Sequence, residues 1–136
     1  MNVTITVDGG CRNNGTDHAE MYGSARILWD RDLEHEAGAK HYTFNYGPGT
    51  NNQAEYFALL SALELLKGLG FESVDLAIHT DSALLANQIT GRWRIKNATL
   101  RTLACEVRNM LGDAVLVSTY KFVQVPREQI VAVLGH

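Results

Sequence analysis

The amino-acid sequence predicts an α/β fold in which helices pack on a five-stranded mixed sheet. Three observations support this prediction. The chain opens with three segments of strand character, a long segment of helical periodicity follows, and strand and helix patterns then alternate. The expected order of elements, β-β-β-α-β-α-α-β, combines an antiparallel meander with strands that are joined through helices.

The first three elements are expected to be strands. Residues 3–8 (VTITVD) alternate and are rich in β-branched side chains, and the pair Gly9-Gly10 after them signals a turn. The next candidates cover residues 22–29 and 33–46, with a charged Asp-Arg-Asp tip between them. Together these segments predict an antiparallel meander.

Residues 51–66 change to the period of a helix. Their apolar residues fall on one stripe, which ends before two glycines that stop the helix. The stripe consists of Ala54, Ala58, Leu59, Ala62, Leu63 and Leu66. An amphipathic helix with one face on the sheet is therefore expected.

Strand and helix patterns alternate in the remainder of the chain. Residues 74–80 form an apolar strand, and residues 82–89 form a short helix. A second amphipathic helix follows Asn97, and residues 114–125 form the last strand. The chain is expected to reach His136 before another full helix forms.

Length and composition indicate a single domain that covers residues 1–136, because 46% hydrophobic residues suffice for one core. No apolar run approaches the roughly 20 residues that span a bilayer, and the N-terminus lacks the pattern of a signal peptide. Cys11 and Cys105 form no CxxC pair, which favours neither a disulfide framework nor zinc. We expect a cytoplasmic protein without membrane association.

The charge is unevenly distributed along the chain. A net charge of −3 argues mildly against nucleic-acid binding, which usually leaves a basic surface. Residues 1–90, however, hold 5 Lys/Arg against 12 Asp/Glu, whereas residues 91–136 hold 7 against 3. A basic C-terminal face could therefore still bind a polyanion.

Three acidic residues are candidate metal ligands. Asp8 and Asp81 lie at the predicted ends of two strands, where ligands bind in open α/β sheets. Glu55 lies in the first turns of the long helix, on or beside the stripe that faces the sheet, where an ionised carboxylate needs compensation. Taken singly, these residues are more simply explained as a turn aspartate, a helix cap and a partner of the helix dipole.

Converging carboxylates would form a set of hard oxygen ligands of the kind that Mg²⁺ and Mn²⁺ prefer. The sequence contains no His/Cys spacing that would favour zinc. Such a set predicts in-line attack of an activated water on a phosphodiester, with one ion near the nucleophile and a second near the leaving oxygen.

Three blocks of the sequence resemble the signatures of type 1 ribonuclease H. They occur in the order found in that family, and the similarity extends from about residue 3 to residue 128. The blocks are TVDGGCRNNG (6–15), TNNQAEYFALLSALE (50–64) and IHTDSALLANQITGRWRIKN (78–97). The resemblance implies a ribonuclease H-like fold, a monomer, cleavage of the RNA strand of an RNA·DNA hybrid, and Asp8, Glu55 and Asp81 as metal ligands.

The resemblance also assigns substrate contacts. Backbone amides and short amide side chains can reach 2′-hydroxyls across a shallow minor groove, and basic residues around Trp93 are typical of a phosphate track. The alternatives are helix capping at Asn51 and Gln53, and a tryptophan that fills the junction between two helices. The assigned positions are Gly9, Gly10, Arg12, Asn13, Asn14, Thr50, Asn52, Gln53, Ser82, Trp93, Arg94 and Lys96.

The C-terminal segment departs from the family pattern. YKFVQVPREQ (120–129) resembles the closing block of the archaeal and plant-like branch, in which Arg127 would help product release or orient the attacking water. A surface ion pair is the simpler alternative for this arginine. The fourth metal-ligating aspartate, expected near Leu134, is missing, so either a divergent or cut terminus holds the second metal weakly, or Glu128 or His136 replaces it.

The leading interpretation is thus an endoribonuclease that hydrolyses the RNA strand of RNA·DNA hybrids with Mg²⁺ or Mn²⁺ at Asp8, Glu55 and Asp81. One alternative is a hybrid-binding module of weakened catalysis. Another is a related nuclease of the same fold that acts on a different nucleic acid. A small nucleotide-binding domain is disfavoured, because the sequence contains neither a P-loop nor a GxGxxG motif.

Overall fold

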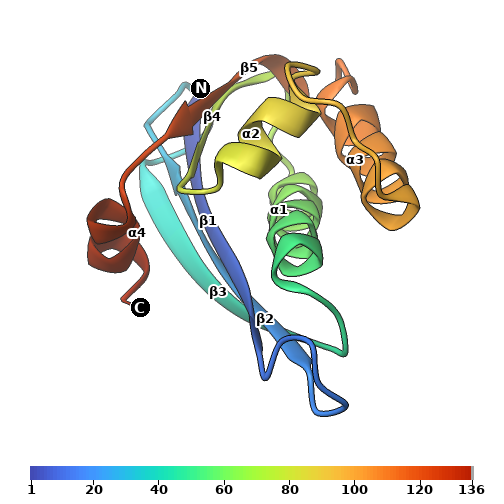
Figure 1. The fold of residues 1–136 in the computed structure, drawn as a ribbon. Coiled ribbons are helices and arrows are strands. Elements are labelled where there is room, and N and C mark those ends of the chain that lie inside the picture. The colour runs from blue at the N-terminus through green and yellow to red at the C-terminus, as the bar shows by residue number, and fades with distance from the viewer. Residues whose placement is uncertain (136) are drawn as a thin grey trace.

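The computed structural model describes residues 1–135 and confirms the predicted fold class (Figure 1). One mixed sheet has the strand order β3-β2-β1-β4-β5. The strands are β1 (Asn2–Arg12), β2 (Glu20–Trp29), β3 (Gly38–Gly47), β4 (Val74–Thr80) and β5 (Val117–Gln124). The helices are α1 (Asn51–Gly68), α2 (Ala83–Ile89), α3 (Ala98–Leu111) and α4 (Arg127–Leu134).

The sheet changes from antiparallel to parallel pairing at β1. This strand pairs with β2 in antiparallel orientation and with β4 in parallel orientation, while β2 pairs with β3 and β4 pairs with β5. Helices α1, α2 and α3 cover one face of the sheet, and α4 lies on the other (Figure 1). No helix within residues 1–135 has the length and apolar character needed to cross a membrane.

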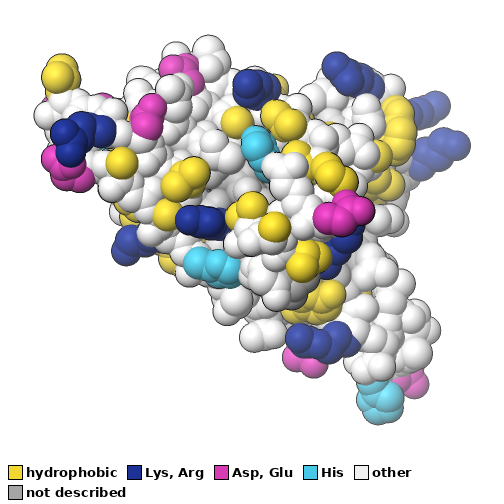
Figure 2. Space-filling model, turned by 90° about the vertical axis from the view of Figure 1, so that its left-hand side faces the viewer, with side chains coloured by type: hydrophobic (Ala, Val, Ile, Leu, Met, Phe, Trp, Pro, Cys, Tyr) yellow, Lys and Arg dark blue, Asp and Glu magenta, His cyan; other side chains and the backbone are white. Residues whose placement is uncertain are grey.

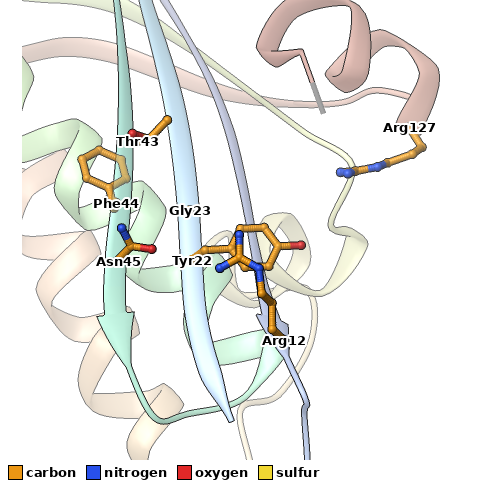
Figure 3. A pocket seen from close by; sticks show the side chains of 7 residues that line it. All are labelled: Arg12, Tyr22, Gly23, Thr43, Phe44, Asn45 and Arg127. Carbon is orange, nitrogen blue, oxygen red and sulfur yellow. The ribbon is translucent and has the colours of Figure 1, made fainter. Parts of the chain in front are cut away.

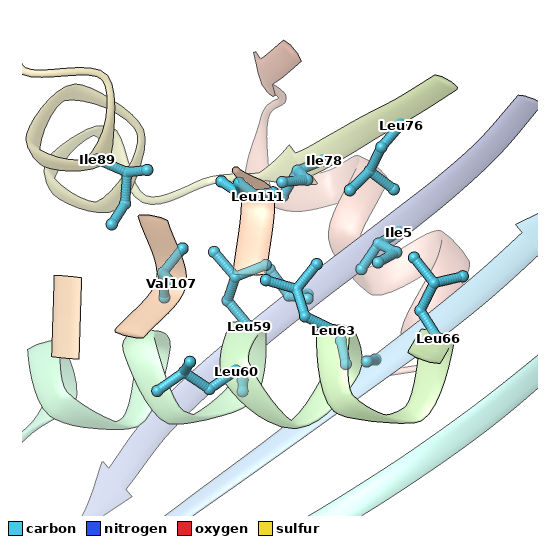
Figure 4. Packing of buried hydrophobic residues seen from close by; sticks show 14 of the residues in the cluster. Ile5, Leu59, Leu60, Leu63, Leu66, Leu76, Ile78, Ile89, Val107 and Leu111 are labelled. Atoms are coloured by element: carbon cyan, nitrogen blue, oxygen red, sulfur yellow. The ribbon is translucent and has the colours of Figure 1, made fainter. Parts of the chain in front are cut away.

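Helix α1 forms the centre of the main core. Leu59, Leu63 and Leu66 are fully buried on the face that packs against β1 and β2 (Figure 4). Ile5 and Ile78 meet this helix from β1 and β4. Full burial of each such side chain contributes about 1.5–3 kcal/mol, and the packing holds the N-terminal turns of α1 against the middle of β1.

Strand β1 is longer than predicted. It does not end at Asp8, because residues 9–12 remain paired with β2 instead of turning away. Gly9 and Gly10 are therefore strand residues. The backbone of α1 approaches Gly9 closely, and the Tyr22 ring approaches Gly10. The sequence interpretation of Gly9-Gly10 as a turn was wrong.

Strand β3 and strand β5 are shorter than predicted. β3 begins at Gly38, and Leu33, which was assigned to this strand, is fully exposed in the preceding turn. The Asp32 carboxylate accepts hydrogen bonds from the backbone N–H groups of Glu34 and His35, which stabilises that turn in place of a strand. β5 covers residues 117–124 rather than 114–125.

Helix α4 corrects the expectation that no further full helix would form. Ile130 and Leu134, which are four residues apart, bury one side of this helix against Val125. Gly135 adopts a left-handed conformation (φ 85°) and ends the helix. The spacing of Ile130 and Leu134 before Gly135 was the sequence signal for this helix.

The close approach of α1 to β1 predicts a sensitive position at Gly9. A Cβ atom there would lie 2.7 Å from the Glu55 backbone nitrogen and would collide with the Ala54 carbonyl. We expect Gly9→Ala to lower the free energy of unfolding by about 3 kcal/mol, because backbone atoms of α1 must move. Urea denaturation measures this change.

Gly68 provides the matched control for this prediction, because a Cβ atom there meets nothing within 4 Å. Gly68→Ala lies at the end of the same helix and should raise the free energy of unfolding by about 0.5 kcal/mol. Equal stability of the Gly9→Ala variant and the wild type would show that α1 is not held at this distance from β1.

Candidate active site

Asp8 and Asp81 are brought together by the parallel ladder between β1 and β4. The last pair of that ladder joins Thr6 to His79, and each aspartate lies two residues beyond it. Because side chains alternate along a strand, both carboxylates lie on the face opposite the main core. Asp8 is buried, and Asp81 is partly exposed just after the end of β4.

Glu55 reaches the same place from the first turns of α1. The helix begins with a capping box: Thr50 Oγ1 accepts the Gln53 N–H at 3.1 Å, and Gln53 Oε1 accepts the Thr50 N–H at 3.1 Å. The absence of a side chain at Gly9 then allows this part of α1 to rest on β1. The Gly9 backbone N–H donates a hydrogen bond to the Glu55 carboxylate.

The three carboxylates form one cluster. One oxygen from each of Asp8, Glu55 and Asp81 lies within 4.8 Å of the others. The Oε2 atom of Glu55 is buried and has no hydrogen-bond partner in residues 1–135. Burial, followed by the charges of Asp8 and Asp81, raises the pKa of Glu55 to about 9.

Arg127 is the cation that contacts this cluster. Its Nη1 atom lies 2.8 Å from Asp8 Oδ2 and 3.4 Å from Asp81 Oδ2, while about half of its side chain remains exposed. The hydrogen bond with Asp8 is the main reason that the pKa of Arg127 is raised. Helix α4, which was not expected, places this arginine at the site because Arg127 is its first residue.

The position of the missing fourth carboxylate is apolar. Leu134 is buried together with Ile130 and Val125. Glu128, one proposed substitute, is exposed and does not belong to any group of candidate metal ligands within residues 1–135. His136, the other proposed substitute, lies outside the described residues.

The predicted RNA-contacting segment continues β1 past the carboxylates. Gly10 lies beneath the ring of Tyr22, whose hydroxyl would be 2.5 Å from a Cβ atom at this glycine. The guanidinium of Arg12 lies 4.7 Å from the centroid of the same ring. Asn13 has a positive φ of 56° at the following turn, and Asn14 is exposed beside it.

The predicted contacts at the start of α1 divide into two groups. Thr50 and Gln53 form reciprocal hydrogen bonds between side chain and backbone in the capping box. Gln53 therefore caps the helix, as the alternative to a substrate contact had it. Asn52 is exposed at the first turn. Asn51 had been considered only as a cap, but its Oδ1 accepts the Cys11 backbone N–H at 2.7 Å and links α1 to β1.

The remaining predicted contacts follow β4. Ser82 caps α2, because its hydroxyl accepts the Leu85 N–H at 3.1 Å. Trp93 is 48% exposed, which agrees with a surface role better than with a filled junction between helices. Arg94 and Lys96 are exposed in the same segment between α2 and α3, and this segment lies on the side of the molecule away from α4 (Figure 1).

Three polar residues near the site were missed in the sequence interpretation. Tyr22, Thr43 and Asn45 line a cleft of about 530 Å³ together with Arg12 and Arg127 (Figure 3). Their alternation on β2 and β3 was visible in the sequence, but nothing there indicated that α4 would leave this part of the sheet uncovered.

The cluster has the chemistry of a site for a hard divalent cation. Among residues 1–135 it offers carboxylate oxygens alone, one of which is buried without a partner, and no cysteine or histidine of that range belongs to it. A bound cation would compensate the desolvation that otherwise keeps the Glu55 carboxyl protonated. The residues present therefore fit Mg²⁺ or Mn²⁺.

Known proteins are similar to this chain in both sequence and fold. A model of the reverse transcriptase-like family matches residues 12–133. The bifunctional protein Rv2228c of Mycobacterium tuberculosis is 34% identical over 113 residues, which are 83% of this chain and 29% of that protein. The chain thus spans less than a third of the length of this relative.

Solved structures extend the similarity over nearly the whole chain. RNase H1 from Halobacterium salinarum has a TM-score of 0.80 at 26% identity, covering 98% of this chain and 94% of that one. LC11-RNase H1 in complex with an RNA/DNA hybrid has a TM-score of 0.79 at 26% identity, covering 96% and 90%. The chain belongs to the reverse transcriptase-like family and, within it, to the type 1 ribonucleases H.

Proposed function

We propose that this protein is an endoribonuclease that hydrolyses the RNA strand of RNA·DNA hybrids by a two-metal-ion mechanism. The observation that carries this proposal is the convergence of Asp8, Glu55 and Asp81 with a buried, unpartnered Glu55 oxygen. Membership of the type 1 ribonucleases H supports the choice of substrate. So does the similar fold of LC11-RNase H1, which was solved with an RNA/DNA hybrid.

The three carboxylates would hold the cations. Two Mg²⁺ or Mn²⁺ ions held by these residues would supply an activated water for in-line attack and charge stabilisation at the leaving oxygen. The three carboxylates would offset most of the positive charge of the two ions. Glu55 would give up its proton on becoming a ligand, so cation binding would be coupled to proton release.

Arg127 would act on the phosphate side of the site. Its guanidinium forms ion pairs with Asp8 and Asp81, the same carboxylates that a cation would bind. With the carboxylates engaged as ligands these ion pairs would be weaker, and the Arg127 guanidinium would be available to a phosphate oxygen of the substrate or product. This role agrees with the contribution to product release that the family resemblance implies.

Recognition of the hybrid would use both sides of the carboxylate cluster. On one side, the exposed side chains of Asn13 and Asn52 would meet ribose hydroxyls, whereas the Gly9 N–H already donates to the Glu55 carboxylate. On the other side, the segment that contains Trp93 and its basic neighbours would follow the DNA strand.

A second function is favoured by one specific observation. Because Leu134 is buried and apolar where a fourth carboxylate was expected, the chain can be a hybrid-binding module with weakened catalysis. The two functions differ in one measurable respect, since a binding module retains the hybrid without cutting it.

Incubation with labelled duplexes tests the proposed function. The RNA strand of an end-labelled RNA·DNA hybrid should be cut internally in the presence of Mg²⁺ or Mn²⁺, whereas matched RNA·RNA and DNA·DNA duplexes should remain intact. Binding of the hybrid without cleavage in either ion would support the binding module. Cleavage of one of the other duplexes in preference to the hybrid would assign the fold to a different nuclease substrate.

The apolar fourth position also predicts the preferred ion. We expect hybrid cleavage at low ion concentration to be about tenfold faster with Mn²⁺ than with Mg²⁺, because Mg²⁺ demands a nearly ideal octahedral ligand set. Initial rates over a concentration series of each ion measure this difference. Equal rates at equally low concentrations would mean that the second ion is held without a fourth carboxylate.

A further inference from the structure

The cleft on the α4 face of the sheet has a composition suited to an anionic ligand. Its polar lining comes from Arg12 on β1, Tyr22 on β2, Thr43 and Asn45 on β3, and Arg127 on α4 (Figure 3). No carboxylate lines it among the described residues. In the space-filling view of this face, basic and acidic side chains are interspersed, and a histidine and an acidic side chain lie at the projecting end (Figure 2).

Arg12 and Tyr22 form a preorganised unit at one end of the cleft. The arginine is held over the tyrosine ring at 4.7 Å, and it takes part in no ion pair within residues 1–135. A guanidinium that is already positioned on an aromatic ring loses less conformational freedom when it binds a phosphate. Thr43 and Asn45 are exposed next to it and can donate further hydrogen bonds.

Arg127 connects the cleft to the carboxylate cluster. Arg127 lines the cleft and also contacts Asp8 and Asp81. In Figure 3 its guanidinium and the Tyr22 hydroxyl both point into the space between α4 and β1. Tyr22 packs over Gly10, which is only two residues from Asp8.

We propose that this cleft binds a phosphate and its ribose in the RNA strand, next to the scissile phosphate, between Arg12 and Arg127. The inference rests on the proposed function and adds a subsite to it. Arg12 would bind the phosphate, the Tyr22 ring would pack against the ribose, and Asn45 would donate a hydrogen bond to a phosphate oxygen or to the 2′-hydroxyl.

The position of the cleft favours a nucleotide within the strand over a free nucleotide. Consecutive residues of a β-strand are about 3.3 Å apart, so Gly10, over which the cleft residue Tyr22 packs, lies close to Asp8. An RNA strand that presents one phosphate to the carboxylates would therefore place a neighbouring phosphate near the cleft.

Scanning of the strand phosphates tests the proposal. The substrate is a hybrid whose RNA strand contains one defined cleavage site, and each neighbouring phosphate is replaced in turn by an uncharged methylphosphonate. In the wild type, one of these replacements should raise KM about tenfold, which is the contribution expected of hydrogen bonds to a charged group, with little change in kcat.

Variants then locate that phosphate. In Arg12→Ala and Asn45→Ala, KM for the unmodified hybrid should already be raised, and the same methylphosphonate should change it less than twofold. Tyr22→Phe keeps the ring and should preserve the tenfold effect. Lys67→Ala removes an exposed charge from the opposite end of α1 and should behave like the wild type.

The possible outcomes are distinct. If no methylphosphonate position loses its effect in Arg12→Ala or Asn45→Ala, the strand subsite is overturned. Inhibition of the wild type by adenosine monophosphate, lost in Arg12→Ala and without any coupling in the phosphate scan, would assign the cleft to a free nucleotide instead. Failure of the wild type to cut any unmodified hybrid would contradict the proposed function itself and would be seen before the scan.

Discussion

Replacement of Asp8 by asparagine is expected to lower the rate of RNA-strand hydrolysis by about three orders of magnitude, because a cation at such a site supplies several kcal/mol of transition-state stabilisation. Asp8 is the buried member of the carboxylate cluster and contacts Arg127 at 2.8 Å. Asparagine keeps the size of the side chain but offers a neutral oxygen in place of the charged ligand. Initial rates on the hybrid at a saturating Mn²⁺ concentration measure the loss.

Asp75→Asn is the matched control for this prediction. Asp75 lies on β4, on the same face of the sheet as Asp81, but it is exposed and accepts a hydrogen bond from Thr119 Oγ1 at 2.7 Å. We expect this variant to retain the wild-type rate within a factor of two. Hybrid binding should survive in Asp8→Asn. Cleavage by Asp8→Asn at more than a tenth of the wild-type rate would exclude Asp8 as an essential ligand.

The carboxylates could be predicted from the sequence because each is tied to a local pattern. Asp8 and Asp81 follow apolar strands, and Glu55 lies near the apolar stripe of a long helix, so the topology alone brings them to one region. The same patterns gave the types of the eight predicted elements correctly, but they missed α4. Their exact ends depended on pairing with β2 and on the side chain of Asp32, which no periodicity describes.

The parts of the site that the sequence did not reveal depend on long-range contacts. Arg127 could be placed only by family resemblance, since its contact with Asp8 spans most of the chain. The cleft beside it requires α4 to lie on the opposite face of the sheet from α1 (Figure 1). Asn51 likewise pairs with Cys11, 40 residues away, and a local rule would have assigned it to helix capping.

The raised pKa of Glu55 predicts how the stability of the metal-free protein depends on pH. The carboxyl keeps its proton up to a pH of about 9 in the folded chain, against an ordinary value of 4.5. Between these values the folded state binds more protons than the unfolded state, so the free energy of unfolding falls as pH rises. The stabilisation is complete below about pH 4.5 and is lost as pH rises through the pKa of the folded state.

The size of this effect and its cause can be separated by one substitution. Each pH unit in the window corresponds to about 1.4 kcal/mol, so the Glu55 contribution between pH 5 and pH 8 is about 4 kcal/mol. Urea denaturation in the presence of EDTA at both pH values should show that loss in the wild type. Glu55→Gln keeps the shape of the side chain but cannot ionise, and its pH dependence should be weaker by this amount.

Glu64→Gln, an exposed change on the same helix, should retain the full dependence. Addition of Mn²⁺ should reverse much of the loss at pH 8 in the wild type, because the cation binds only the deprotonated carboxylate, and it should do less for Glu55→Gln. Identical pH dependence in the wild type and Glu55→Gln would mean that the Glu55 carboxyl ionises normally in the folded chain. The buried oxygen would then need a compensating partner other than a proton.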